Sequence, residues 1–187
     1  MKKLFPLLFG LIAPLFSFSQ HPLPKSFSDK IAKYGLHFTY PYGWETVPVL
    51  SNSVMPYDFA VHLKSAYEGK YCEIRYLILP PGKDLTAFLA DAKSKICLQL
   101  FEAHESFVKL QPSEGDLTNK ADWLTTFGST QYDDYQFKKD FAQEFTDGNV
   151  VIMEKKGKAR IVVMILRNKD NYACDDLSPE LFYSLTF

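Results

Sequence analysis

The sequence contains few cysteines, few glycines and no excess of charge of either sign. Its 187 residues include 3 Cys and 9 Gly, and 21 basic side chains stand against 22 acidic ones. This balance provides no electrostatic footprint for nucleic acid and no basic cluster that would hold an anionic membrane surface. Hydrophobic residues make up 47% of the chain and aromatic residues 16%, which excludes disorder over most of its length. The length fits one domain that folds without a metal or a disulfide.

Motifs for catalysis and cofactor binding are also missing. The sequence has no G-x-S-x-G nucleophile elbow, no glycine-rich phosphate loop and no C-x-x-C pair. His104 begins an H-E-x-x-H pattern in which the second histidine is replaced by Val108, so the metalloprotease motif is incomplete. The acidic pairs at 133–134 and 175–176 lack the ligand spacing of a calcium loop. We therefore predict no catalytic residue, no cofactor and no metal ligand.

An enzymatic alternative stays open through a few scattered residues. Asp58 and His62 are four residues apart in a predicted strand, which places them on one face of that strand. Together with His104 they are the candidates for an extracytoplasmic hydrolase whose site is assembled without a motif. A surface or packed histidine is the simpler interpretation of His62.

The amino-terminal residues have the three regions of a secretory signal peptide. Lys2 and Lys3 precede an apolar run over Leu4–Phe16, and Ser17 and Ser19 supply small side chains for a cleavage site. The run is shorter than the ~20 residues that a membrane-spanning helix needs. We therefore predict cleavage after Ser19 and no stable membrane insertion.

This leader divides the chain into a signal peptide over residues 1–19 and a single domain over residues 20–187. The domain is expected in the periplasm or outside the cell, because the same kind of leader serves both. Removal of two leader lysines leaves 21 − 2 = 19 basic against 22 acidic side chains, a net charge of about −3.

The cysteines are Cys72, Cys97 and Cys174. Three is an odd number, so at most one intramolecular disulfide can form, which an exported protein would tolerate. Cys72 lies in a strand-like run and Cys97 on the flank of a predicted helix. We favour small core hydrophobes over a disulfide for these two residues, and the disulfide remains an alternative.

The clearest helix is predicted over Leu85–Leu100. Pro80-Pro81-Gly82 ends the preceding strand, and Asp84 is placed to cap the helix. Apolar residues recur at intervals of three or four along one side, with charged and polar residues opposite. A second, closing helix is predicted at Leu181–Leu185 from its Ser-Pro start.

Strands are predicted around these helices. In the run Tyr71–Leu79, Cys72, Ile74, Tyr76 and Ile78 point one way while Glu73 and Arg75 point the other, which indicates a strand that is half-buried at its start. Further strands are expected at Asp58–Lys64 and Ala121–Phe127. A hairpin is expected from 149–154 and 160–166, and the second of these is apolar enough to be covered on both faces. Asp147-Gly148 has the composition of another hairpin turn.

Two short motifs resemble those of a known family. The segment F-T-Y-P-Y-G-W (Phe38–Trp44) resembles the F-x-x-P-x-G-W start of PsbP/Mog-type, DcrB-like domains. The segment F-Y-S-L-T-F (Phe182–Phe187) is similar to the end of the same domains. The resemblance implies an α+β fold, an α/β/α sandwich whose central antiparallel sheet is flanked by helices, and it implies a non-catalytic accessory or binding role. It transfers Phe38, Pro41, Gly43 and Trp44 as structural marks and no catalytic residue. An NTF2-like cone is the alternative fold.

Aromatic residues are the remaining unusual feature. Most of these rings are expected in the core, but Tyr and Trp side chains could also line an apolar groove with a polar rim. The possible ligand or partner surface consists of Trp123, Tyr132, Tyr135 and Phe137. We therefore expect an exported binding or accessory protein that recognises a protein partner or a small apolar ligand. The alternatives are the hydrolase and a periplasmic immunity or inhibitor protein.

Overall fold

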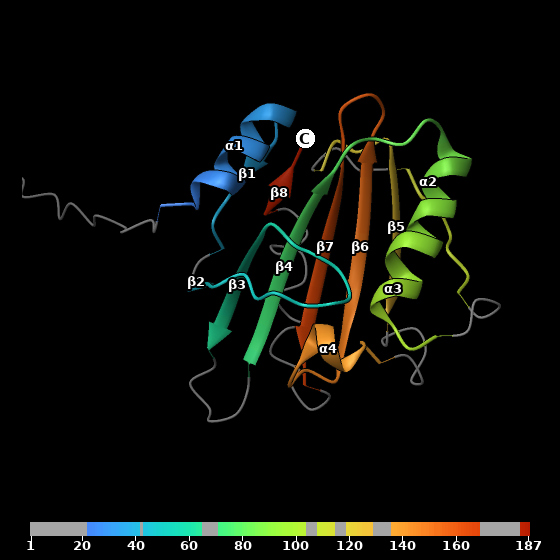
Figure 1. Cartoon of the computed structure of the whole chain (residues 1–187). Coiled ribbons are helices and arrows are strands. Elements are labelled where there is room, and N and C mark those ends of the chain that lie inside the picture. Colours follow the sequence, from blue (N-terminus) through green and yellow to red (C-terminus); the bar gives the residue numbers. More distant parts are fainter. Residues whose placement is uncertain are drawn as a thin grey trace, which may run out of the picture.

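A six-stranded antiparallel sheet forms the centre of the fold (Figure 1). The computed structural model describes residues 22–41, 43–64, 71–103, 108–114, 119–128, 136–168 and 184–187. In sheet order the strands are β2 (Glu45–Val47), β3 (Phe59–Lys64), β4 (Tyr71–Leu79), β7 (Ala159–Arg167), β6 (Asp147–Lys155) and β5 (Trp123–Gly128). A separate antiparallel pair joins β1 (His37–Phe38) to β8 (Leu185–Thr186).

The central strand β7 is buried on both faces of the sheet. Its run Ile161–Leu166 contains only apolar residues, all of them buried. Because successive side chains of a strand point to opposite faces, alternate residues enter two separate cores. Val162, Met164 and Leu166 belong to one core, and Ile161, Val163 and Ile165 belong to the other. The expected coverage of this strand on both faces is confirmed.

A long helix covers the first of these cores, which we name the α2-side core. The helix begins as α2 (Leu85–Asp91), continues as the π-helical segment η1 (Ala92–Cys97) and ends as α3 (Leu98–Leu100). The amide of Ala87 donates to Asp84 Oδ1 at 2.8 Å, so the predicted N-cap is confirmed. Phe88, Ile96 and Leu100 point into the core. The short helix α4 (Lys139–Ala142) adds Phe141 to the same core.

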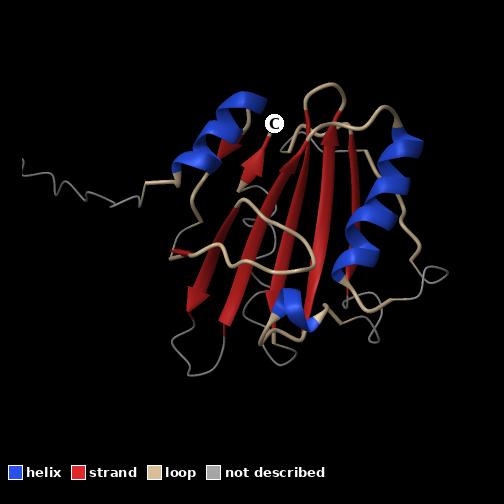
Figure 2. Ribbon diagram, viewed as in Figure 1, coloured by secondary structure: helices blue, strands red, loops and turns tan. Residues whose placement is uncertain are grey.

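The opposite core, the α1-side core, is covered by α1 (Lys25–Tyr34) and by the β1–β8 pair (Figure 2). The ring of Phe27 stacks on Phe59 with 4.6 Å between centroids. Trp44, one of the structural marks carried by the family resemblance, is buried here as well. Among the described residues no helix is both long enough and apolar enough to cross a membrane.

These layers form the predicted α+β fold, a central antiparallel sheet flanked by helices. The NTF2-like alternative requires a curved sheet that encloses a pocket. Here side chains packed under α1 fill one face of the sheet, and side chains packed under α2 fill the other. The sandwich is therefore the better description.

The Asp147-Gly148 pair is not a hairpin turn, which corrects the sequence-based expectation. It opens strand β6, where Asp147 pairs with Arg167 and Gly148 with Leu166. A Cβ atom on Gly148 would lie 1.9 Å from the carbonyl oxygen of Ile165. Glycine is needed here because the backbone of β7 approaches too closely for a side chain. The hairpin that does form joins β6 to β7 through the turn at 155–159, as expected.

The carboxy-terminal expectation also needs correction. Leu185 lies in strand β8 rather than in a closing helix, and it pairs with Phe38 of β1. The rest of the predicted helix lies outside the described residues. Pairing with β1 buries Leu185 and Phe187 in the α1-side core, so tertiary packing decides the conformation of this segment.

The polar side of β4 is more buried than its alternation indicates. Arg75 is 1% exposed, although the predicted face was half-buried. Its Nε donates to Glu73 Oε1 at 2.6 Å and its Nη1 to the carbonyl oxygen of Phe141. The guanidinium also lies 4.8 Å from the ring centroid of Tyr57. A paired guanidinium can be buried among rings in this way because its charge is neutralised and its donors are used.

Candidate functional site

Trp123 is the predicted surface residue that the structure leaves partly exposed. It opens β5, the edge strand of the sheet, where it is half-buried and stands opposite Glu154 of β6. Its indole packs on the ring of Phe88 from α2, with 5.9 Å between centroids. Trp123 is therefore packed against the α2-side core and is partly accessible at the edge of the sheet.

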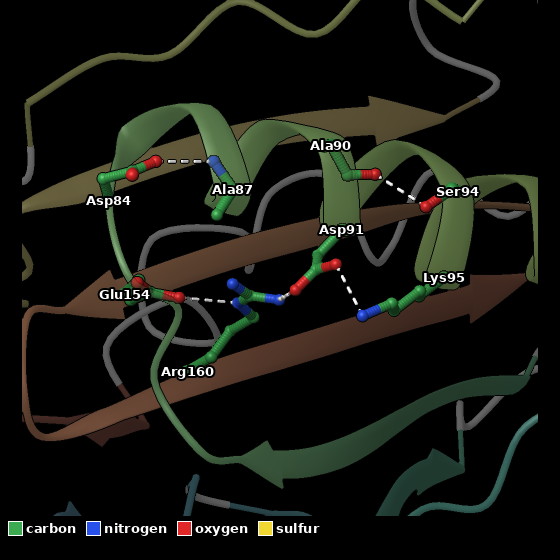
Figure 3. A network of polar contacts seen from close by, with 8 residues as sticks. All are labelled: Asp84, Ala87, Ala90, Asp91, Ser94, Lys95, Glu154 and Arg160. Carbon is green, nitrogen blue, oxygen red and sulfur yellow. Dashed lines mark hydrogen bonds and ion pairs between the residues drawn. The ribbon is translucent and has the colours of Figure 1, made fainter.

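A buried ion pair contacts Phe88 of this aromatic pair, and Figure 3 shows the ion pair together with Asp91 and Lys95. Arg160 Nε donates to Glu154 Oε2 at 2.7 Å, and the side chains of Arg160 and Glu154 are 4% and 0% exposed. The guanidinium lies 5.4 Å from the ring centroid of Phe88. Trp123, Phe88 and the ion pair therefore form one continuous packed unit.

The helix joins this unit through Asp91. Arg160 Nη1 donates to Asp91 Oδ2 at 3.2 Å, and Lys95 Nζ lies 2.7 Å from the other oxygen of the same carboxylate. The hydrogen bond from Lys95 lowers the pKa of Asp91 most strongly; burial raises it, and Arg160 lowers it further, so the net shift of the pKa is downward. Asp91 directly precedes the π-helical segment η1. The ion pairs thus tie the sheet to the helix where its hydrogen-bond pattern changes.

Two buried atoms of the ion pair have no hydrogen-bond partner among the described residues. They are Glu154 Oε1 and Arg160 Nη2. Both lie under Gly82, where a Cβ atom would be 2.7 Å from Arg160 Nη2 and 3.2 Å from Glu154 Oε1. A side chain at position 82 would clash with the ion pair. Glycine is therefore needed for a steric reason in the connection between β4 and α2.

This arrangement supports the aromatic contact. Glu154 and Arg160 are buried and bonded to each other, and Arg160 also contacts Phe88 and Asp91. The part of the chain that the structure describes holds no group of three or more side chains arranged to bind a metal. The unit can therefore hold Trp123 in place.

The hydrolase candidates do not come together in the described structure. Both oxygens of Asp58 contact Lys30 Nζ, at 2.7 and 2.8 Å, and one of them also accepts the amide of Ile78. His62 Nε2 instead lies 3.4 Å from Glu45 on the neighbouring strand. Asp58 therefore joins α1 to the sheet, and His62 takes part in a cross-strand contact. His104 lies outside the described residues.

Phe137, a second residue of the predicted aromatic surface, is buried. Phe137 is 4% exposed and stacks on Phe101 with 4.2 Å between centroids. It belongs to the α2-side core, because an isolated bridge between Phe101 and Phe137 holds the two rings face to face. Phe137 is therefore not a surface residue. Tyr132 and Tyr135 lie outside the described residues.

The cysteines divide into two kinds. Cys97 is a free, buried thiol, and burial raises its pKa to about 12, so it is an unreactive core residue as expected. Cys72 is disulfide-bonded, which corrects the preference for a small core hydrophobe at that position. Cys174 lies outside the described residues.

Sequence inspection missed Arg160, Glu154 and Asp91 as parts of a common unit. The available signal was a charged residue on each side of the β6–β7 turn, within two runs that are otherwise apolar. That pattern is also typical of strand ends at the surface. Only the register, in which Glu154 pairs with Arg160, places the two charges side by side under α2.

Comparison with known proteins adds a fold likeness. No protein-family model matches the chain, and a search of the curated proteins finds no match. Among solved structures, cyanobacterial PsbP (CyanoP) from Synechocystis sp. PCC 6803 is similar, with a TM-score of 0.47 and 14% sequence identity over 82% of this chain and 86% of that chain. The weak resemblance to PsbP that the two short motifs indicated is confirmed, and we base no functional argument on it.

Proposed function

We propose that this chain is an exported, non-catalytic binding or accessory protein whose recognition surface is centred on Trp123. The observation that carries the proposal is the half-exposed indole on an edge strand, backed by Phe88 and the buried Glu154–Arg160 pair. A large ring on a rigid base loses little conformational freedom on binding. Such residues dominate the binding energy of many interfaces.

Export is supported by the leader and by the cysteine chemistry. The basic start, the apolar run and the small residues before Gln20 have the order of a cleaved signal peptide. Cys72 is disulfide-bonded, and disulfides persist in oxidising compartments such as the periplasm. The proposed location is therefore the periplasm or the extracellular space.

A protein is the favoured partner over a small apolar ligand. A ligand groove would need several rings with open faces, but Phe137 and Phe141 are buried in the α2-side core. Among the described residues of the predicted aromatic surface, Trp123 is the partly exposed one, and it lies at the edge of the sheet, which suits a protein surface better than an enclosed site. An immunity or inhibitor protein is one form of this proposal, since it would also act through an exposed patch.

The test is native mass spectrometry of the protein purified from its own host, beside intact-mass measurement under denaturing conditions. We expect a mature chain that begins at Gln20 and retains a protein partner. Trp123→Ala should weaken that complex by about 30-fold or more, the effect of losing an interface hot spot. Leu50→Ala is the control, because Leu50 is an exposed apolar residue, 42% accessible, in the loop after β2.

Three results would contradict the proposal. The first is a mature mass that still includes the leader. The second is a complex that Trp123→Ala and Leu50→Ala weaken equally, provided that both variants keep the unfolding temperature of the parent. The third is a retained small molecule without a protein partner, which would support the apolar-ligand alternative.

A further inference from the structure

Lysines from separate segments lie together at one end of the sheet. The β6–β7 turn carries Lys155, Lys156 and Lys158. Lys155 Nζ donates to the carbonyl oxygen of Lys120 at 2.9 Å, which brings the segment before β5 to this turn. Figure 1 shows the turn at the same end of the sheet as the carboxy-terminal residue and the β4–α2 connection.

Two more segments bring lysines to the same end. Lys158 Cε lies 3.4 Å from the position of a Cβ atom on Gly35, the residue that ends α1. The β4–α2 connection at Gly82 covers the Glu154–Arg160 pair, which flanks the β6–β7 turn. These contacts place the segments that carry Lys33 and Lys83 at this end. We name the surface formed by Lys33, Lys83, Lys120, Lys155, Lys156 and Lys158 the lysine end.

These ammonium groups are not neutralised within the described part of the chain. No ion pair there involves a lysine of the lysine end, whereas Lys25, Lys30 and Lys95 elsewhere each pair with an aspartate. Two aspartates, Asp84 and Asp122, lie in the same segments and offset part of this charge, which leaves six lysines against two carboxylates. Asp84 caps α2 through the amide of Ala87, and Asp122 accepts the amide of Lys156 at 2.7 Å. The lysine end is therefore a local cationic surface on a chain whose expected mature charge is about −3.

We propose that the lysine end docks an acidic segment of a partner protein. This inference rests on the proposed function, because the surface borders the residue proposed as the anchor. Trp123 stands opposite Glu154 at the end of β6 and packs against the α2-side core. Lys155, the next residue of β6, points to the other face, so a partner that covers the indole would reach the lysines across the end of the sheet. Charge complementarity at the rim would guide its approach and orientation.

The cations of this surface are all lysines. Arg75, Arg160 and Arg167 are all buried, so the arginine fork that recognises phosphate in two-point geometry is not offered at this surface. A lysine ammonium acts as a point charge that a glutamate or an aspartate satisfies. The remaining negative charge of the domain opposes an extended polyanion, but a short acidic segment within a Debye length of about 8 Å still meets the local charge.

The backbone beneath the lysines is held in place. The amide of Lys158 donates to the carbonyl oxygen of Lys155 at 3.0 Å, and Asp122 fixes the amide of Lys156. Gly157 has a φ of +69°, a conformation that glycine adopts without strain. A short, bonded turn fixes the backbone positions from which the lysine side chains extend, so the backbone needs no ordering on binding.

The test measures binding of a fluorescein-labelled decaglutamate peptide to the mature protein at low salt. We compare the parent with Lys120→Gln/Lys156→Gln and with the matched control Lys109→Gln/Lys139→Gln. All four lysines are exposed, and both doubles remove the same charge. We expect the first double to weaken binding by about fivefold or more and the control by less than about twofold, because the attraction is local. Added salt should weaken the parent complex as well.

Equal weakening by both doubles, or no binding of decaglutamate by the parent, would overturn the inference. Tighter binding to a DNA 20-mer, or to vesicles of three parts phosphatidylglycerol and seven parts phosphatidylethanolamine, would also overturn it in favour of a phosphate polyanion. A host partner whose binding is weakened by Trp123→Ala but not by Lys120→Gln/Lys156→Gln would overturn this inference and leave the proposed function intact. Unchanged unfolding temperatures verify that each variant is folded.

Discussion

Replacement of Glu154 by glutamine should destabilise this protein strongly, because it leaves the Arg160 guanidinium buried without its carboxylate. The two side chains are 0% and 4% exposed, and Arg160 Nε lies 2.7 Å from Glu154 Oε2. Loss of one partner from a buried ion pair costs about 3–5 kcal/mol. We expect about 3 kcal/mol, at the lower end of that range, because Arg160 keeps its contacts with Asp91 and with the ring of Phe88.

Urea denaturation at pH 7 measures this change, and thermal unfolding provides a second reading. For a domain of this size, about 3 kcal/mol corresponds to a fall of about 6–12 °C in the unfolding temperature. Glu45→Gln is the matched control, because Glu45 is a mostly exposed partner of His62. It should leave the unfolding temperature unchanged, since exposed ion pairs contribute little.

A double variant separates the ion pair from simple loss of packing. Glu154→Leu/Arg160→Leu removes both charges and should be more stable than Glu154→Gln, because no charge remains buried alone. The reasoning is refuted if Glu154→Gln costs less than about 1 kcal/mol. It is also refuted if the double variant is the less stable of the two, since the cost would then come from shape rather than from charge.

Three further predictions concern acid stability, a close backbone contact and the thiols. The pKa of Asp91 is lower in the folded state than its ordinary value of 3.8, so its ionised carboxylate stabilises the fold fully at pH values above 3.8, and this stabilisation is lost as the pH falls through the lower folded pKa. Asp91→Asn should therefore flatten the acid limb of a stability–pH curve, and an unchanged limb would contradict this. Gly148→Ala should reduce the free energy of unfolding by more than about 1 kcal/mol in urea denaturation, because its Cβ would lie 1.9 Å from a carbonyl oxygen of β7. Gly157→Ala is the control: nothing lies within 4 Å of its Cβ, so it measures only the cost of a positive φ for alanine. Iodoacetamide should leave the native protein unmodified and should alkylate Cys97 only after unfolding, as intact mass without reductant will show, because Cys97 is a buried free thiol and Cys72 is disulfide-bonded.

The sequence was sufficient to predict the elements whose signals are local. The apolar stripe over Leu85–Leu100, with Asp84 before it, predicts the helix that forms. The hairpin of β6 and β7 follows from two Val- and Ile-rich runs around a Lys-Lys-Gly-Lys turn. The all-apolar run at 161–166 also predicts burial on both faces. In each case neighbouring residues carry the whole pattern, so no distant contact is needed to interpret it.

The sequence was misleading where packing between distant segments decides the outcome. Asp147-Gly148 has the composition of a turn, but a close approach to β7 requires glycine inside a strand. Leu185 follows a helix-like start, yet pairing with β1 makes it part of a strand. Local preferences are worth only fractions of a kcal/mol per residue, and a buried contact between segments outweighs them.

The candidate site shows the same division. Composition indicated that aromatic residues matter, but burial decided that Phe137 is a core residue and that Trp123 stays half-exposed. The even balance of acidic and basic residues concealed the lysine end, because its lysines come from separate segments that meet only in the folded chain. The sequence by itself therefore determined the class of fold and its main helix and hairpin, since these depend on neighbouring residues. The tertiary structure alone decided which charges are buried as pairs and which are gathered at the surface, because strand register and helix packing set the distances between them.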